Sequence, residues 1–217
     1  MADLIKRASR LLRKRSSPLK FPTSGFETVH PSRLLEEERF EQFKHGQYYP
    51  AYIGELISSR YQIVGKLGFG ATSTVWLARD LEYAGSFSLM VNNADTTRGH
   101  EYVTLKIYSR DEDIEEVLRI YKQLDQESSG HAGHAHIRKA LDIFTIPRSG
   151  GDHPCFVQRP MWESFRDLLY RNANHRFPEE LLKSGLTQIF LALDYLHTEC
   201  KLVHTGKQIG LASKRLP

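Results

Sequence analysis

A glycine turn between two β-rich segments is the part of the sequence most suited to chemistry. Residues 67–80 read LGFGATSTVWLARD, with Gly68 and Gly70 in the turn and Val75 in the segment that follows. Glycines let backbone N–H groups approach phosphate oxygens, and an apolar residue on the next strand can cover a base. The pattern predicts contact with a nucleotide. The alternative, a dinucleotide-binding turn, needs a helix after the glycines, whereas residues 74–78 favour a strand.

Three further segments favour the turn found in protein kinases. Lys106 ends the sequence VTLK in a predicted strand, where a kinase lysine pairs with the nucleotide phosphates. A long helix predicted over residues 179–200 is followed by LVHT at 202–205, the order in which kinases run into the catalytic loop. Pro160 and Met161 follow the last predicted strand, where a hinge would offer backbone groups to adenine.

Four segments resemble the fungal branch of the SR-protein kinases. They are GELISSRYQIVGKLG (54–68), STVWLARD (73–80), YVTLKIY (102–108) and LDYLHTEC (193–200). The resemblance covers roughly residues 41–205. It implies a bilobal Ser/Thr protein kinase fold, ATP with Mg²⁺, and a protein substrate of the Arg-Ser-rich kind that this family favours. In that family a serine takes the place of the third loop glycine, as Ser73 does here.

The resemblance also implies a set of nucleotide contacts. These are Leu67, Gly68, Gly70, Ser73, Val75, Lys106, Gln158, Pro160 and Met161. Glu116 is the expected carboxylate partner of Lys106, although alignment on Ile120 and Tyr121 puts Val117 in that place. Gln158 and Arg159 stand where an apolar residue and an acidic residue are usual.

The catalytic loop departs from the family pattern. After His204 and Thr205, Gly206 stands where the catalytic aspartate is expected, and residues 206–217 contain neither Asp nor Asn. The chain stops before any DFG sequence. Since phosphoryl transfer needs a positioned hydroxyl and bound metal, we expect no catalytic residue, no metal site and no transfer by this chain. Relative to the family, the chain also has an insertion near residues 81–100. The codons for Gly206 and Lys207 can contain a splice-donor sequence. One hypothesis is therefore that the tail and the insertion are translated intron sequence.

The order of elements predicts an α+β fold. A kinase-like N-lobe with a five-stranded antiparallel sheet and one helix is expected, followed by the first helices of an incomplete C-lobe. The expected strands are 61–66, 74–78, 101–108, 140–146 and 155–158, and the expected helices are 113–124, 164–171 and 179–200. The last helix carries an apolar seam of Leu182, Leu186, Ile189, Leu193 and Leu196, the spacing of a buried helix. The C-lobe elements that would cover this seam are missing from the chain, so we expect an exposed patch that is prone to aggregation.

The expected division of the chain has five parts. Residues 1–40 form a basic arm and linker, 41–60 an extension that packs on the lobe, 61–160 the N-lobe, 161–205 the start of the C-lobe, and 206–217 an unrelated tail. Within this division, residues 34–43 predict a short acidic helix, and the aromatic residues 48–52 are expected to pack on the lobe.

Composition excludes several classes. The chain has 217 residues, 40% of them hydrophobic and 26% charged, which excludes collagenous and wholly disordered proteins. No apolar run is long enough for a transmembrane helix, and two distant cysteines favour a reducing compartment, cytoplasmic or nuclear. Seven Lys and Arg residues lie among the first 20. Three interpretations of this basic arm are open: a solvated tail, a mitochondrial presequence, or a segment that contacts a membrane surface or nucleic acid. No specific nucleic-acid partner is expected for the rest of the chain.

Other candidate site residues receive simpler interpretations. His131, His134 and His136 are expected in a solvated loop rather than a metal site. Cys155 and Cys200 are expected to be packed thiols. Asp142 and Asp152 are expected to be turn residues.

Three functions remain open at the level of sequence. The chain is part of an SR-protein-kinase-like enzyme, or a pseudokinase module that binds nucleotide or serves as a scaffold, or an unstable product without function. ATP is the cofactor in the first two.

Overall fold

The computed structural model describes residues 16–41, 43–44, 46–82, 102–110, 112–126, 130–161, 163–204 and the backbone of 213–215, without the side chains of Asp125, Gln126 and His204. The chain divides into two compact units, which are treated separately below. Unit 1 combines the chain up to Asp111 with Asp142–Arg159, and unit 2 combines Glu112–Leu141 with the chain from Pro160 onward. The arm, most of the insertion and most of the tail lie outside the described residues.

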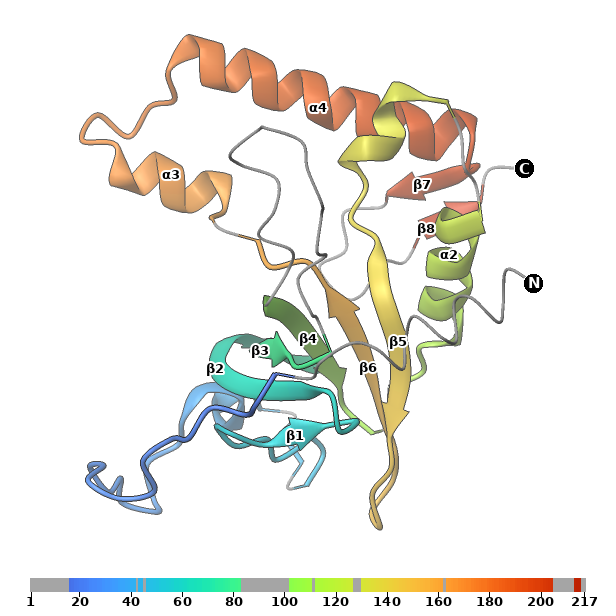
Figure 1. The fold of residues 1–217 in the computed structure, drawn as a ribbon. Helices are drawn as coiled ribbons and strands as arrows, with labels where there is room; N and C mark the ends of the chain where they lie inside the picture. Colours follow the sequence, from blue (N-terminus) through green and yellow to red (C-terminus); the bar gives the residue numbers. More distant parts are fainter. Residues whose placement is uncertain are drawn as a thin grey trace. The chain divides into compact units, whose positions relative to one another are not determined.

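Unit 1 is built around a six-stranded sheet (Figure 1). Its strands are β1 (Leu56–Ile57), β2 (Tyr61–Gly70), β3 (Ser73–Asp80), β4 (Tyr102–Tyr108), β5 (Ala140–Ile146) and β6 (His153–Gln158). Their order is β1-β2-β3-β4-β6-β5, and the pairings from β1 through β4 to β6 are antiparallel. The predicted strands and their antiparallel arrangement are confirmed, and β1 is an additional short strand that the sequence did not reveal.

One face of this sheet forms the core of unit 1. Residues directly opposite each other on antiparallel strands share a face, so the paired Trp76 and Leu105 lie with Val157, which pairs with Leu105. The same face carries Ile63 opposite Ala78. Each of these side chains is buried and belongs to one cluster. Strict alternation along β3 therefore leaves Val75 and Leu77 on the other face.

The chain before β1 packs on unit 1. Tyr49 lies in the core cluster, and its hydroxyl donates to Glu55 Oε1 at 2.6 Å. Residues of the predicted linker are also tied to the sheet, because the side chain of buried Gln62 accepts from Leu19 N and donates to Leu19 O. The predicted acidic helix is wrong in extent: only one 3-10 turn forms, η1 (Glu36–Arg39).

Unit 2 contains the helices. They are α2 (Glu115–Gln126), the 3-10 helix η2 (Ala132–His136), α3 (Phe165–Arg171) and α4 (Glu179–Thr198), with the short strands β7 (Leu202–His204) and β8 (Ser213–Arg215) paired antiparallel. A second apolar cluster joins Ile120 and Leu124 of α2 to Tyr195 of α4 and to Cys200. The Gln123 side chain also donates to Cys200 O at 2.8 Å. The predicted α2, α3 and α4 are confirmed to within a few residues.

The histidine segment is not the solvated loop that the sequence predicts. It forms η2, which packs closely on α4 because residue 133 has no side chain: a Cβ on Gly133 would lie 1.9 Å from Leu191 O. His131 lies 3.2 Å from an Asp194 carboxylate oxygen, and the His134 ring meets the Tyr195 ring edge-on. The close approach of η2 to α4 accounts for the glycine at position 133.

Asp142 is also not a turn residue. It lies in β5 and accepts a hydrogen bond from the hydroxyl of buried Tyr61 at 3.0 Å. Asp152 does cap the β5–β6 turn, where its carboxylate accepts from Arg148 N, and the prediction for it is confirmed. Cys155 and Cys200 are buried thiols, as predicted. Burial raises the pKa of Cys155 far above its ordinary value and keeps it protonated.

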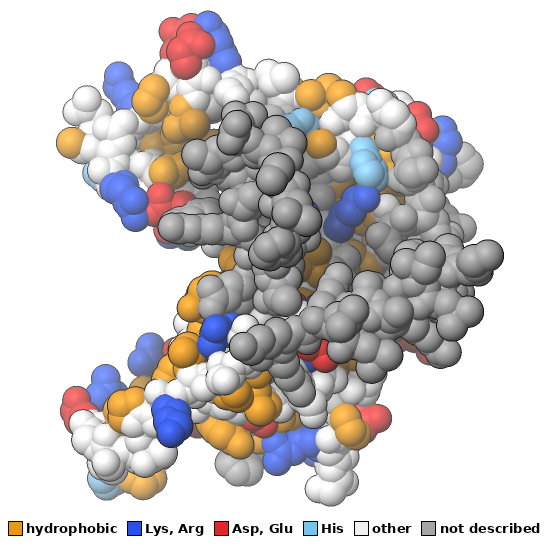
Figure 2. Space-filling model, in the orientation of Figure 1, with side chains coloured by type: hydrophobic (Ala, Val, Ile, Leu, Met, Phe, Trp, Pro, Cys, Tyr) orange, Lys and Arg blue, Asp and Glu red, His pale blue; other side chains and the backbone are white. Residues whose placement is uncertain are grey.

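The apolar seam of α4 is buried at one end only. Leu193 and Leu196 are partly covered, whereas Leu182, Leu186 and Ile189 are each more than 40% exposed and Phe190 is 63% exposed. Figure 2 shows hydrophobic side chains at the surface over α3 and the first turns of α4. The expected exposed apolar patch on this helix is therefore found along its first half, and these residues form an exposed apolar stripe.

We expect the exposed α4 stripe to bind hydrophobic dyes and to promote self-association. Replacing Leu182, Leu186 and Ile189 together by Gln should lower the fluorescence of bound anilinonaphthalene sulfonate and the apparent mass in sedimentation, because the apolar surface is removed while helix propensity changes little. Glu179→Gln on the same helix is the control. Unchanged dye binding in the triple variant would show that the dye binds elsewhere.

Among the described residues no helix is long and apolar enough to cross a bilayer.

Candidate nucleotide-binding site

The second face of the unit 1 sheet brings most of the predicted nucleotide contacts together. Val75 pairs with Gly68 on one side and with Lys106 on the other, and Lys106 pairs with Phe156. The next row joins Leu77, Thr104 and Gln158 in the same way. Because paired residues share a face, Val75 and Lys106 lie side by side in one row, and Gln158 lies in the next row of the same face.

The glycines of the β2–β3 hairpin are not explained by the fold itself. Neither Gly68 nor Gly70 has the positive φ that favours glycine. A Cβ on Gly68 would meet no atom of the described chain within 4 Å, and one on Gly70 would only touch Ser73 O at 4.0 Å. Glycine within a strand lowers stability. Neither packing among the described residues nor backbone conformation therefore requires glycine at these two positions.

Lys106 is positioned by the strand on which it lies. Its ammonium lies 4.5 Å from the centroid of the Tyr108 ring, two residues along the same face of β4. Its neighbours Leu105 and Ile107 point into the core and are almost fully buried. The rigid strand therefore fixes the stem of the lysine beside the glycine hairpin.

A buried polar pair lies at the other end of this face. Gln158 is buried, and it pairs with Thr104, whose Oγ1 is buried without a hydrogen-bond partner among the described residues. An unsatisfied buried hydroxyl is unfavourable, so a ligand with a polar edge would stabilise this end of the sheet.

Ser73 lies on the same face, because it pairs with Gly70 and with Tyr108, and it is buried at the start of β3. The other predicted contacts lie elsewhere. Leu67 is half exposed at an irregularity in the β2–β3 pairing. Glu116, Pro160 and Met161 belong to unit 2, where Glu116 is exposed beside the buried Val117 and Met161 is exposed. The backbone of His204 lies in β7, and Thr205 and Gly206 lie outside the described residues.

Sequence reasoning missed Tyr48 as a contact of the glycine hairpin. Its hydroxyl donates to Ala71 O at 2.7 Å and lies 3.1 Å from Gly70 O. The aromatic residues 48–52, which include Tyr48, predict only that this stretch packs on the lobe. No pattern within that stretch indicates which ring reaches the hairpin.

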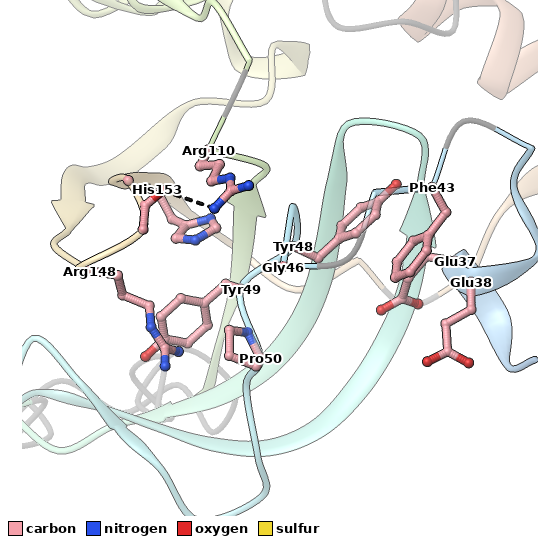
Figure 3. A pocket seen from close by; sticks show the side chains of 12 residues that line it. Glu37, Glu38, Phe43, Gly46, Tyr48, Tyr49, Pro50, Arg110, Arg148 and His153 are labelled. Carbon is pink, nitrogen blue, oxygen red and sulfur yellow. Dashed lines mark hydrogen bonds between the residues drawn. The ribbon is translucent and has the colours of Figure 1, made fainter. Parts of the chain in front are cut away.

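Unit 1 also has a hollow of about 460 Å³ beside this segment (Figure 3). Phe43 and Tyr48 line one end, and Tyr49, Arg148 and His153 line the other. The Arg148 guanidinium lies 5.3 Å from the centroid of the Tyr49 ring. No predicted nucleotide contact lines this hollow, so it is distinct from the face that carries Val75 and Lys106.

The described residues contain no group of His, Cys, Asp and Glu side chains that could hold a metal ion. The three histidines of the η2 segment are engaged with α4 or the solvent, and the residues that follow His204 are outside the described part.

Comparisons with known proteins identify relatives of the chain and a solved structure with a similar fold. No protein-family model matches the chain. A serine/threonine protein kinase of Aspergillus fumigatus is 37% identical over 204 residues, which are 94% of this chain and 48% of that protein. Protein kinase dsk1 of Schizosaccharomyces pombe is 34% identical and SRSF protein kinase 3 of Mus musculus 30% identical, each over 78% of this chain and less than a third of the relative. The chain thus spans about half the length, or less, of these relatives.

A crystal structure of a kinase domain has the same fold, with a TM-score of 0.51 and 20% identity over 73% of this chain and 40% of the other. The sheet and helices therefore define a protein-kinase-like N-lobe with part of a C-lobe. Within that class, the chain is a homologue of the serine/threonine protein kinases of the SR-protein kinase group, as its motifs predict.

Proposed function

We propose that this chain binds ATP through the second face of the unit 1 sheet, in the manner of the kinases to which it is related. The observation that carries the proposal is the pair of glycines, Gly68 and Gly70, that the fold does not require, in register with Val75 and Lys106. A nucleotide is the ligand that makes use of a glycine hairpin, an apolar cover and a lysine in one arrangement.

Each residue has a distinct role in this proposal. The backbone amides of the hairpin donate to phosphate oxygens, Lys106 neutralises phosphate charge, and Val75 covers one face of the base. Thr104 and Gln158 offer polar groups to the edge of the base. From unit 2, Glu116 is proposed as the partner of Lys106, and Pro160 and Met161 as backbone contacts to adenine.

Phosphoryl transfer is not part of the proposed function. Gly206 follows His204 and Thr205 where the relatives' pattern calls for an aspartate, and the segment 206–217 has no Asn to hold a metal ion. ATP fits the residues present, and the described residues contain no group of three or more His, Cys, Asp and Glu side chains that could hold a metal ion. We therefore derive binding only, and infer that Mg²⁺ serves complete members of the group.

The proposal is tested by thermal unfolding with and without ATP. At a nucleotide concentration of about 100 times Kd, binding stabilises the folded state by about 2.7 kcal/mol, which raises the unfolding midpoint by about 5 to 10 °C. Lys106→Ala should abolish most of this shift because it removes the charge that faces the phosphates. Lys122→Ala, an exposed lysine of α2, is the control and should retain the shift.

No shift in the intact chain would refute nucleotide binding. A second readout is transfer of labelled phosphate to an Arg-Ser-rich peptide, which should not exceed the level seen with Lys106→Ala. Transfer above that level would show that the chain catalyses phosphoryl transfer, and it would contradict the proposal that the chain only binds ATP.

A scaffold for protein partners is the second candidate function. The exposed stripe of Leu182, Leu186, Ile189 and Phe190 favours it, because apolar surface of this kind marks interaction sites. Under either function we propose a protein partner, Arg-Ser-rich in the case of a kinase substrate, and a cytoplasmic or nuclear location, with mitochondrial targeting by the basic arm as the alternative.

A further inference from the structure

The segment before β1 is attached to the glycine hairpin at three levels. The Lys66 ammonium of β2 binds the carboxylates of Glu36 and Glu37 in η1, the latter at 2.6 Å. The ring of Phe40 contacts the ring of Phe69, with centroids 5.8 Å apart. Closest to the turn, Tyr48 binds the backbone of Gly70 and Ala71.

Tyr48 is itself firmly held. Its residue is only 8% exposed, and the ring of Phe43 stacks on it with an interplanar angle of 11° (Figure 3). Burial, with a smaller contribution from the nearby Glu37 carboxylate, raises the pKa of Tyr48 above its ordinary value. The hydroxyl is therefore protonated at neutral pH, and its one hydrogen is shared between Ala71 O at 2.7 Å and Gly70 O at 3.1 Å.

Fixing a carbonyl also fixes the neighbouring amide. A trans peptide unit is planar, and its C=O and N–H point in opposite directions. The Gly70 carbonyl shares a peptide unit with the Ala71 amide, and the Ala71 carbonyl shares one with the Thr72 amide. A hydroxyl that draws both carbonyls toward Tyr48 therefore turns these two amides away from it. The next carbonyl, Thr72 O, is held in turn by Ser109 N at 2.9 Å.

From this geometry we propose that Tyr48 is a positioning residue, which preorganises the Ala71 and Thr72 amides for the phosphates of a bound nucleotide. The inference rests on the proposed function and adds a residue from outside the kinase-like motifs. Preorganised donors bind more tightly because the loop does not have to be ordered when the ligand arrives. Tyr48 acts through the backbone of the hairpin and does not itself contact the nucleotide.

The test compares two ligands in the full chain by calorimetry: ATP, which has phosphates, and adenosine, which has none. Tyr48→Phe keeps the ring and removes only the hydroxyl. We expect Kd for ATP to rise about fivefold to tenfold, the equivalent of one lost hydrogen bond, and Kd for adenosine to be unchanged. Tyr52→Phe, at a ring that is 65% exposed in the same segment, is the matched control and should leave both constants unchanged.

A second measurement addresses the hairpin directly. Hydrogen exchange of the Ala71 and Thr72 amides, without nucleotide, should be faster in Tyr48→Phe than in the intact chain, with no change in the core of β4. Equal weakening of ATP and adenosine would reduce Tyr48 to a structural role, and unchanged ATP affinity or unchanged exchange would overturn the inference. If the intact chain binds neither ATP nor adenosine, the proposed function itself fails. If the intact chain binds ATP and Tyr48→Phe binds it equally well, only the role of Tyr48 fails.

Discussion

Gly133→Ala is expected to destabilise unit 2 by about 3 kcal/mol, at the upper end of the range for overpacking in a well-packed interior. The new Cβ would lie 1.9 Å from Leu191 O and 2.8 Å from the Tyr195 Cβ. The first of these is backbone of α4, which cannot rotate aside as a side chain can. The substitution must therefore separate η2 from α4 and weaken the cluster around Tyr195.

The control for this substitution is Gly130→Ala, three residues earlier. A Cβ on Gly130 would meet nothing within 4 Å, and its backbone does not require glycine. We expect it to be neutral or to stabilise by about 0.5 kcal/mol, because alanine has fewer conformations in the unfolded chain. Urea unfolding followed by circular dichroism, which reports α2 and α4, gives both values. Equal stability of the two variants would show that η2 does not pack on α4 in solution.

Arg60→Met is expected to destabilise unit 1 by about 3 kcal/mol, because it leaves a buried carboxylate without its partner. Arg60 donates to both oxygens of Asp80, at 2.8 and 2.7 Å, and the Asp80 side chain is only 4% exposed. The guanidinium also lies over the Tyr61 ring and 3.9 Å from an Asp142 oxygen. One side chain thus connects β2, β3 and β5 at the edge of the core.

The double variant Arg60→Met, Asp80→Leu separates the ion pair from packing. It should be more stable than Arg60→Met alone, because no buried charge remains unpaired. Arg33→Met, at an exposed arginine, should stay within about 0.5 kcal/mol of the intact chain. Urea unfolding followed by the fluorescence of Trp76, which lies in the same core, is the measurement. A double variant less stable than the single one would show that Asp80 has another role.

The Arg60 ion pair should also persist in alkali. The hydrogen bond to Asp80 raises the pKa of Arg60 above its ordinary value. A cation whose pKa is raised by folding contributes its full stability below the unfolded pKa and loses it only as pH rises beyond that value. The difference in unfolding free energy between the intact chain and Arg60→Met should therefore be the same at pH 7 and pH 10.

The sheet was predictable because its signals are local. Alternation along residues 74–78 puts Trp76 and Ala78 on one face and Val75 and Leu77 on the other. The pattern predicts the strand, whereas the packing of the whole sheet decides that the face of Trp76 and Ala78 lies in the core. Gly150 and Gly151 mark the β5–β6 turn in the same way. The two-residue β1 was not predictable, because a strand of that length has no period and forms only where its partner β2 already lies.

The candidate site likewise has features that local sequence predicts and features that depend on tertiary contacts. The sequence by itself determined the glycine hairpin, Lys106 and the kinase relationship, since each depends on residues close together in the chain with a characteristic spacing. Only the tertiary structure decided that Val75, Lys106 and Gln158 lie on adjacent rows of one face, that Gly133 is required by α4, and that Tyr48 reaches Gly70 and Ala71. Those contacts join residues more than 20 positions apart, and their geometry depends on how the strands and helices pack, which no local pattern records.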